Sequence, residues 1–167
     1  INNDLANTIG NLLNRSISMS RKWFNDSVPN QIGTNECSPT LRIKTEEIVD
    51  KYINHMDRIE LKIAAEQIVK LANEANLYLN ERAPWKLIKI PENHNVVSHD
   101  IYSILETCRI IGLLLSPFLP NLSRKLLDQL GCSENIHKWR DCLKWGILEP
   151  TSNLAEPRPV MQKIEYI

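Results

Sequence analysis

The sequence predicts an all-α fold: a bundle of about five helices followed by an irregular C-terminal segment. Apolar residues recur at three- and four-residue steps, the spacing of one helix face, through most of the first 131 residues. Only five of the 167 residues are glycines and 43% are apolar, which suits a helical domain with a buried core. We expect a single domain in two parts, a helical bundle over residues 1–131 and a strap over 132–167 packed on it.

The first helix is predicted from about Asn3 to Trp23, with one apolar face and one amide-rich face. The apolar face carries Leu5, Ile9, Leu12, Met19 and Trp23. The opposite face carries Asn3, Asn7, Asn11 and Asn14, bordered by Arg15. Asparagine destabilises a helix interior by roughly 0.5 kcal/mol relative to alanine. Four in one stripe therefore indicate either a functional face or simply a solvated one.

The second and third helices follow a polar connector over residues 25–34. Ser38 is expected to cap the second helix, with Pro39 at its first position, and the helix runs to about Met56. After a short break, the third helix carries a narrow apolar stripe: Leu61, Ala65, Ile68, Ala72, Ala75 and Leu79.

Pro84 ends the third helix, because it has no backbone N–H and pushes Ala83 out of helical space. Trp85 is therefore a large ring held at the exit of a rigid element. We expect the ten residues after it, KLIKIPENHN, to form a loop in which Lys86 and Lys89 lie close to the ring.

The fourth helix is predicted to be the most buried, because its second half is apolar all round. Ser98 is expected to cap it, and Pro120 then begins a short fifth helix that ends at Gly131. The strap that follows has little periodicity, and Trp139 and Trp145 are its expected anchors.

Composition narrows the range of functions. Lysine plus arginine equals aspartate plus glutamate at 20 each, so any contact with nucleic acid must be local. The longest apolar run, residues 110–115, is shorter than the ~18 to 20 residues that a membrane span needs, and we expect no membrane contact. The four cysteines lack the two-residue spacing of a zinc knuckle, and reduced thiols are expected. The chain does not begin with methionine, and we expect it to be part of a longer polypeptide.

The sequence contains no recognisable catalytic group. The four histidines are scattered, without the spacing of a metal site, and there is no glycine-rich phosphate loop. No serine or cysteine nucleophile has a recognisable general base beside it in the sequence. We therefore expect no catalytic residue, no metal site and no cofactor in this chain.

The residues offer a candidate recognition surface for an unpaired base. An aromatic ring stacks on the face of a base, worth ~1 to 3 kcal/mol, while polar side chains bond its Watson–Crick edge. Asn11 and Arg15 lie one helical turn apart and can meet one base edge. Cytosine, with two acceptors and one amino donor on that edge, suits this pair. The alternative is that Trp85 covers the core, as an aromatic residue after a helix usually does.

Three runs resemble a known family. LANTIGNLLNRSISMSRKWF in the first helix and NLYLNERAPWKL around Trp85 resemble the anticodon-binding helical domain of methionyl-tRNA synthetases, which are class I aminoacyl-tRNA synthetases. EPRPVMQKIE near the end resembles the segment that closes the core of those enzymes. The resemblance covers nearly the whole chain, and it implies an α-helix bundle that reads the CAU anticodon of methionine tRNAs.

The resemblance also implies roles for individual residues. Asn11 and Arg15 match positions of the first helix that contact the anticodon, above all its first base, cytosine. Trp85 matches the tryptophan that stacks on that base, and Pro84 matches the proline that positions the tryptophan. Asn7, one turn before Asn11, matches a position that lines the same site.

Further expectations concern the backbone of the RNA and the rest of the enzyme. Lys86 and Lys89 are expected, from charge and proximity alone, to contact phosphates. The HIGH-like and KMSKS-like signatures, the zinc-binding insertion and the C-terminal dimerisation extension are missing. The resemblance implies a full-length ligase that charges methionine tRNA with ATP and magnesium. We expect this fragment to be a monomer that binds the anticodon stem-loop, joined to the catalytic domain of the same polypeptide, in the cytoplasm or an organelle.

Two alternatives remain open. One is the related domain of an isoleucyl-, leucyl-, valyl- or cysteinyl-tRNA synthetase, which would prefer another anticodon. The other is a helical protein-interaction module that touches no nucleic acid, in which Trp85 is buried and the asparagine face is solvated. The neutral net charge favours the second alternative.

Overall fold

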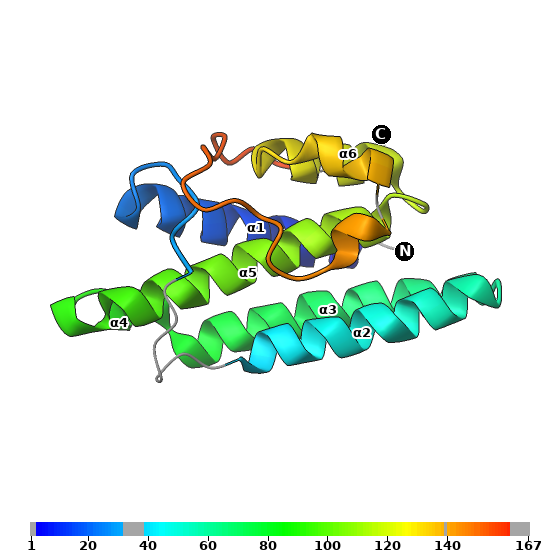
Figure 1. Cartoon of the computed structure of the whole chain (residues 1–167), viewed down its shortest axis with the longest axis horizontal. Helices are drawn as coiled ribbons and strands as arrows, with labels where there is room; N and C mark the ends of the chain where they lie inside the picture. The colour runs from blue at the N-terminus through cyan, green and yellow to red at the C-terminus, as the bar shows by residue number, and fades with distance from the viewer. Residues whose placement is uncertain (1–2, 32–38, 139, 161–167) are drawn as a thin grey trace, which may run out of the picture.

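The computed structural model describes residues 3–31, 39–138 and 140–160, and in these ranges five long helices form a bundle (Figure 1). The long helices are α1 (Asn3–Trp23), α2 (Thr40–Asp57), α3 (Leu61–Arg82), α5 (His94–Leu115) and α6 (Pro120–Gln129). A one-turn helix, α4 (Pro84–Leu87), and three 3-10 turns, η1 (Pro91–Asn93), η2 (Ser133–Lys138) and η3 (Asp141–Leu143), complete the described elements. The all-α prediction is confirmed.

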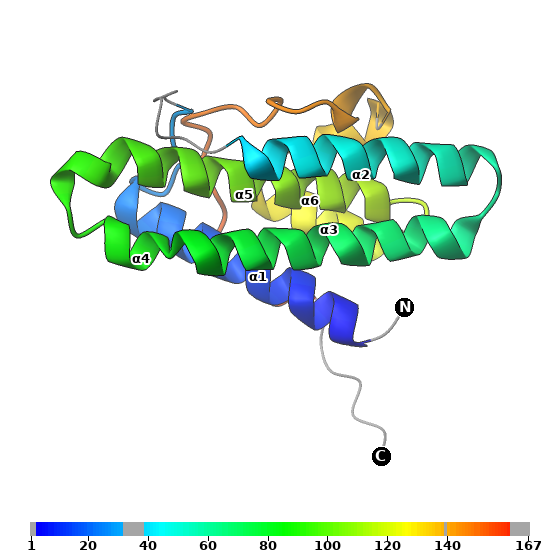
Figure 2. The ribbon, with the colours of Figure 1, turned by 90° about the horizontal axis from the view of Figure 1, so that it is seen from below.

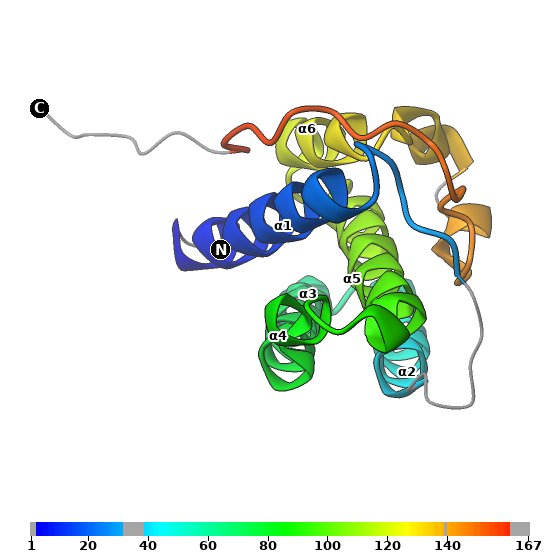
Figure 3. The same ribbon diagram turned by 90° about the vertical axis from the view of Figure 1, so that its left-hand side faces the viewer.

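The central element is α5, which contacts α1, α2, α3 and α6 (Figure 3). From Val96 to Leu115 every residue except His99 is buried, as the apolar second half of this helix led us to expect. Gly112 allows α6 to pack closely, because a Cβ there would come within 2.9 Å of the Leu126 side chain.

The apolar faces of α1 and α3 differ in part from their predicted stripes. On α3, Ala65, Ile68, Ala72, Ala75 and Leu79 are buried, whereas the side chain of Leu61 is 49% exposed because it stands at the outer end of the bundle. On α1 the buried set is wider than expected: Ile9, Leu12, Leu13 and Ile17, with Met19 and Trp23 half-buried against the core. The predictions for the side chains of Asn3 and Leu5 lie outside the described residues.

Three helix starts were predicted wrongly. Pro39 precedes α2 instead of forming its first turn, and Ser38 lies outside the described residues. The expected loop after Trp85 begins inside α4, because Pro84 has the backbone angle of a first helical residue and starts a new helix. Ser98 does not cap α5, which begins four residues earlier at His94; its hydroxyl donates to the carbonyl of Asn30 at 2.7 Å.

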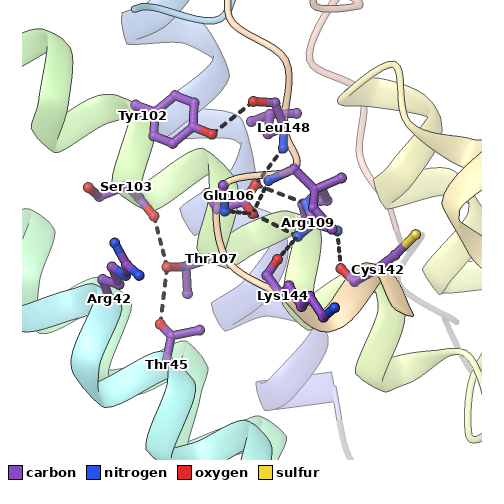
Figure 4. A network of polar contacts seen from close by, with 12 residues as sticks. Arg42, Thr45, Tyr102, Ser103, Glu106, Thr107, Arg109, Cys142, Lys144 and Leu148 are labelled. Carbon is purple, nitrogen blue, oxygen red and sulfur yellow. Dashed lines mark hydrogen bonds and ion pairs between the residues drawn. The ribbon is translucent and has the colours of Figure 1, made fainter. Parts of the chain in front are cut away.

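A buried ion pair on α5 holds the chain beyond α6 (Figure 4). Glu106 and Arg109 have no exposed side-chain surface and pair at 2.7 Å. The Glu106 carboxylate accepts hydrogen bonds from the backbone N–H groups of residues 146, 147 and 148 at 2.8 to 3.1 Å. Arg109 donates to the carbonyls of Cys142 and Lys144 at 2.6 and 2.9 Å. Both charges therefore bind the segment 142–148 directly to the central helix.

Of the two tryptophans expected to anchor the strap, Trp145 is among the described residues. Trp145 is half-buried and packs on the core, while its indole N–H has no hydrogen-bond partner. Trp139 lies outside the described residues. Gln129 on α6 also bonds the backbone N–H and carbonyl of Arg158, at 2.9 and 3.1 Å.

The fold should lose stability in alkali, because three buried acids and a partly buried one are neutral in it. Burial raises the pKa of Cys108 and of Cys132 from 9.0 to about 12, and the pKa of Tyr52 and of Tyr102 from 10.0 to about 12. The unfolded chain releases these protons at lower pH than the folded chain. The native state is therefore fully favoured below about pH 9 and loses stability as pH rises toward 12. We expect the urea concentration at the midpoint of unfolding to be lower at about pH 10.5 than at about pH 8.

A cysteine variant provides the control for this measurement. Cys108→Ala removes one of the four groups, so its urea midpoint should fall less steeply over the same pH range than that of the unsubstituted chain. Equal midpoints at both pH values for the unsubstituted chain would contradict the prediction.

Candidate nucleic-acid interface

The position of Trp85 is set by a one-residue junction between α3 and α4. Ala83 has φ 43° and ψ 57°, the left-handed conformation, and its N–H donates to the carbonyl of Leu79 at 3.1 Å. Pro84 is buried and occupies the first position of α4, so Trp85 follows directly on this turn. Left-handed backbone is unfavourable for alanine, which indicates that surrounding contacts hold the junction in place.

Those contacts come from α5. The Asp100 carboxylate is fully buried and accepts from the Arg82 Nε at 2.8 Å and the Tyr78 hydroxyl at 2.7 Å. Both donors belong to the last turns of α3. Asp100 therefore fixes the end of α3, and with it the start of α4, to the central helix.

Arg15 on α1 and Trp85 on α4 lie in contact. The Arg15 Cζ atom is over the indole ring, 5.5 Å from its centroid, a distance typical of a cation–π interaction. Arg15 Nη2 also lies 3.4 Å from Asn80 Oδ1 on α3, a long hydrogen bond. The contact arises because α1 crosses α3 in the half of the bundle that ends in α4 (Figure 2). Trp85 is half-buried: it packs on the core and is still partly open to solvent.

The other predicted residues lie on the same two helices as this pair or directly after them. Asn11 and Asn7 lie one and two turns before Arg15 on α1, and both are exposed. Lys86, in α4, and Lys89, just after it, are also exposed. The structure therefore brings the Arg15 guanidinium and the Trp85 ring together at one corner of the bundle, and it leaves the amide and ammonium groups of the other four residues exposed.

A match to a family model identifies the kind of domain that contains this corner. The model of the anticodon binding domain of methionyl tRNA ligase matches residues 28–166. The chain belongs to this family. The match does not include residues 1–27, but the relatives described next match 99% of the chain and so include α1.

The relatives of this anticodon-binding domain are methionine–tRNA ligases. The enzyme of Bacillus subtilis is 34% identical over 99% of the chain, and that of Caldanaerobacter subterraneus subsp. tengcongensis is 33% identical over 99%. The chain spans 25% and 26% of these two proteins, about a quarter of their length.

Solved structures extend the likeness to three dimensions. The free form of Mycobacterium tuberculosis methionyl-tRNA synthetase superposes with a TM-score of 0.88, at 28% identity over 99% of this chain and 33% of that one. The complex of the same enzyme with methionyl-adenylate gives 0.86, at 30% identity over 98% of this chain and 32% of that one. The likeness includes α1, since it covers nearly the whole chain.

One polar residue of this anticodon-binding domain at the corner was not predicted. Asn80 on α3 touches Arg15, and it belongs to a second set of asparagines at helical spacing, Asn73, Asn76 and Asn80. The sequence signal was present, because the step of three and then four residues puts these amides on one face.

In the part of the anticodon-binding domain that the structure describes, no three side chains of His, Cys, Asp or Glu are grouped so that they could bind a metal ion. The same residues include no helix with the length and apolar character needed to cross a bilayer.

Proposed function

We propose that this domain reads the CAU anticodon of methionine tRNAs and that Arg15 and Trp85 recognise its first base. The observation that carries the proposal is the Arg15 guanidinium lying 5.5 Å from the centre of the Trp85 ring. A planar ring that can stack on a base and donors that can bond its edge are thus adjacent.

In the proposed complex, cytosine stacks on Trp85 and presents its Watson–Crick edge to α1. Arg15 donates to the two acceptors of that edge, and the Asn11 carboxamide accepts from the amino group. A uracil or purine in the first position leaves some of these groups unpaired, which weakens binding.

The neighbouring residues have supporting roles in this proposal. Pro84 holds the tryptophan at the end of α3, and Asn7 lines the site one turn from Asn11. Lys86 and Lys89 contact backbone phosphates, which position the RNA without reading its sequence.

We propose further that this chain acts within a longer polypeptide. The chain is one part of a ligase that joins methionine to its tRNA with ATP and magnesium, and the chemistry takes place in the catalytic domain outside these 167 residues. We propose that the chain itself is a non-catalytic, monomeric unit, with the bundle over residues 1–131 and the strap over 132–167, in the cytoplasm or an organelle. Anticodon binding places the acceptor end of the tRNA in the distant active site.

Two observations support this function over the alternatives. Trp85 is partly open and lies beside Arg15, whereas a protein-interaction module was expected to bury the ring. The curated relatives named above are methionine enzymes, which favours the methionine anticodon over those of the related class I synthetases.

Replacing Arg15 tests the proposal. The unsubstituted chain should bind a CAU stem-loop more tightly than a GAU stem-loop at matched salt. Arg15→Ala should reduce this preference by about tenfold, ~1.4 kcal/mol, because it removes the donors for the base edge. The two affinities are measured by titration of labelled stem-loops.

A second arginine provides the control for loss of positive charge. Arg124 is exposed on α6, across the bundle from α4 (Figure 3), and Arg124→Ala should keep the preference for CAU. Equal binding of both stem-loops by the unsubstituted chain, or an unchanged preference in Arg15→Ala, would contradict the proposed function.

A further inference from the structure

Helix α1 exposes one narrow ridge of polar side chains. Between residues 7 and 22 its exposed residues are Asn7, Asn11, Arg15, Ser18 and Lys22, and every other residue of this stretch is buried or half-buried. The steps of four, four, three and four residues place all five on one side of the helix. We name this set the α1 ridge. Its first three members belong to the proposed anticodon site, whereas Ser18 and Lys22 extend beyond that site.

The charge of the α1 ridge is positive, although the net charge of the chain is zero. The sequence contains no aspartate or glutamate between residues 5 and 24. In contrast, α2, α3 and α6 each expose acidic side chains, among them Glu46, Glu66 and Asp128. Arg21 is half-buried and pairs with Asp26 at 2.6 Å, so Lys22 is the cation that the end of α1 presents to solvent. A local positive strip on a neutral chain attracts phosphates.

The position of the two outer residues gives the ridge a direction. Ser18 and Lys22 follow Arg15 toward the end of α1, which lies at the same end of the bundle as α4 (Figure 2). At 1.5 Å per residue they lie about 4.5 and 10.5 Å from Arg15 along the helix axis. The end of α1 is held on α5, because the rings of Phe24 and His94 meet edge to face with their centroids 5.2 Å apart. The ridge therefore leads away from the base-reading pair on a fixed support.

We propose that Ser18 and Lys22 bind the sugar–phosphate backbone of the tRNA beside the first anticodon base. This inference rests on the proposed function, since it takes Arg15 as the residue that meets that base. The Lys22 ammonium pairs with one phosphate, and the Ser18 hydroxyl donates to a backbone oxygen nearer to the base. These contacts hold the strand along α1 and read no sequence, so they strengthen the binding of every anticodon to the same extent.

The salt dependence of RNA binding tests the phosphate contact of Lys22. The affinities for CAU and GAU stem-loops are titrated between about 50 and about 200 mM salt. Lys22→Gln should make the slope of log affinity against log salt shallower by about 0.7 to 0.9 for both RNAs, because one phosphate contact is lost. Over this range of salt the variant should lose about threefold less affinity than the unsubstituted chain. The ratio of the CAU to the GAU affinity should stay the same.

Two further variants complete the experiment. Lys51 is an exposed lysine on α2, on the side of the bundle away from α1 (Figure 3), and Lys51→Gln should leave the slope unchanged. Ser18→Lys adds a cation within the ridge and should steepen the slope by about as much as Lys22→Gln reduces it. Circular dichroism verifies that each variant keeps its helices. An unchanged slope in Lys22→Gln, or an equal reduction in Lys51→Gln, would overturn the inference.

The outcome can be separated from that of the proposed function, because the two depend on different quantities. The anticodon assignment depends on the ratio of the CAU and GAU affinities in the unsubstituted chain, and equal affinities overturn it. The backbone contact depends on the change in salt slope, which is measured on each RNA by itself. A CAU preference combined with an unchanged slope in Lys22→Gln overturns only the backbone contact.

Discussion

Replacing Glu106 with alanine is expected to lower the free energy of unfolding by about 3–5 kcal/mol, the range measured when one partner of a buried ion pair is removed. Glu106 and Arg109 are both fully buried. Without the carboxylate, the Arg109 guanidinium keeps its charge in the interior, and three backbone N–H groups between Gly146 and Leu148 lose their acceptor. The measurement is urea unfolding followed by circular dichroism.

An exposed ion pair of similar helical spacing provides the control. Arg42 and Glu46 on α2 pair at 2.9 Å with about half of each side chain exposed, so Glu46→Ala should change stability by no more than about 0.5 kcal/mol. Similar losses for Glu106→Ala and Glu46→Ala would show that the buried pair does not hold the C-terminal segment.

Replacing Trp85 with alanine is expected to weaken binding of the CAU stem-loop by ~1 to 3 kcal/mol, roughly 5- to 150-fold, because the stacking surface is lost. Trp85→Phe keeps a smaller ring in the same place and should lose less. Affinity is measured by titration at fixed salt, since phosphate contacts make binding strongly dependent on salt.

The tryptophan in the strap separates loss of stacking from loss of packing. Trp145 is also half-buried against the core, and Trp145→Ala should lower stability while it leaves the stem-loop affinity unchanged. An undiminished affinity in Trp85→Ala, in a variant that unfolding measurements show to be folded, would refute the role of the ring.

Much of the architecture could be predicted because it depends on local rules. The helix stop at Pro84 follows from the missing N–H and the fixed φ of proline, and α3 does end at Arg82. The proximity of Arg15 and Trp85 was anticipated as well, although through family resemblance and not from periodicity. What these residues do with an anticodon stays a prediction.

The errors arose where tertiary contacts override a local signal. Ser98 has the sequence context of a helix cap, but its hydroxyl is bound to Asn30, 68 residues away in sequence. Glu106 and Arg109 have the spacing of an ordinary surface pair, three residues apart, and the sequence does not show that residues 142–148 pack against them. Leu61 fits the apolar stripe of α3, yet nothing in its spacing shows that the bundle ends beside it.

The junction at Ala83 has a consequence for how this domain tolerates change. Only one left-handed residue separates α4 from α3. The direction in which the indole points therefore depends on the rotation of the last turns of α3 about the helix axis. One residue inserted between Tyr78 and Pro84 would rotate the ring by about 100° around the helix axis, away from α1. Point replacements at the exposed positions of this stretch leave the direction of the ring unchanged, whereas insertions and deletions change it, so its length should be far less variable than its composition.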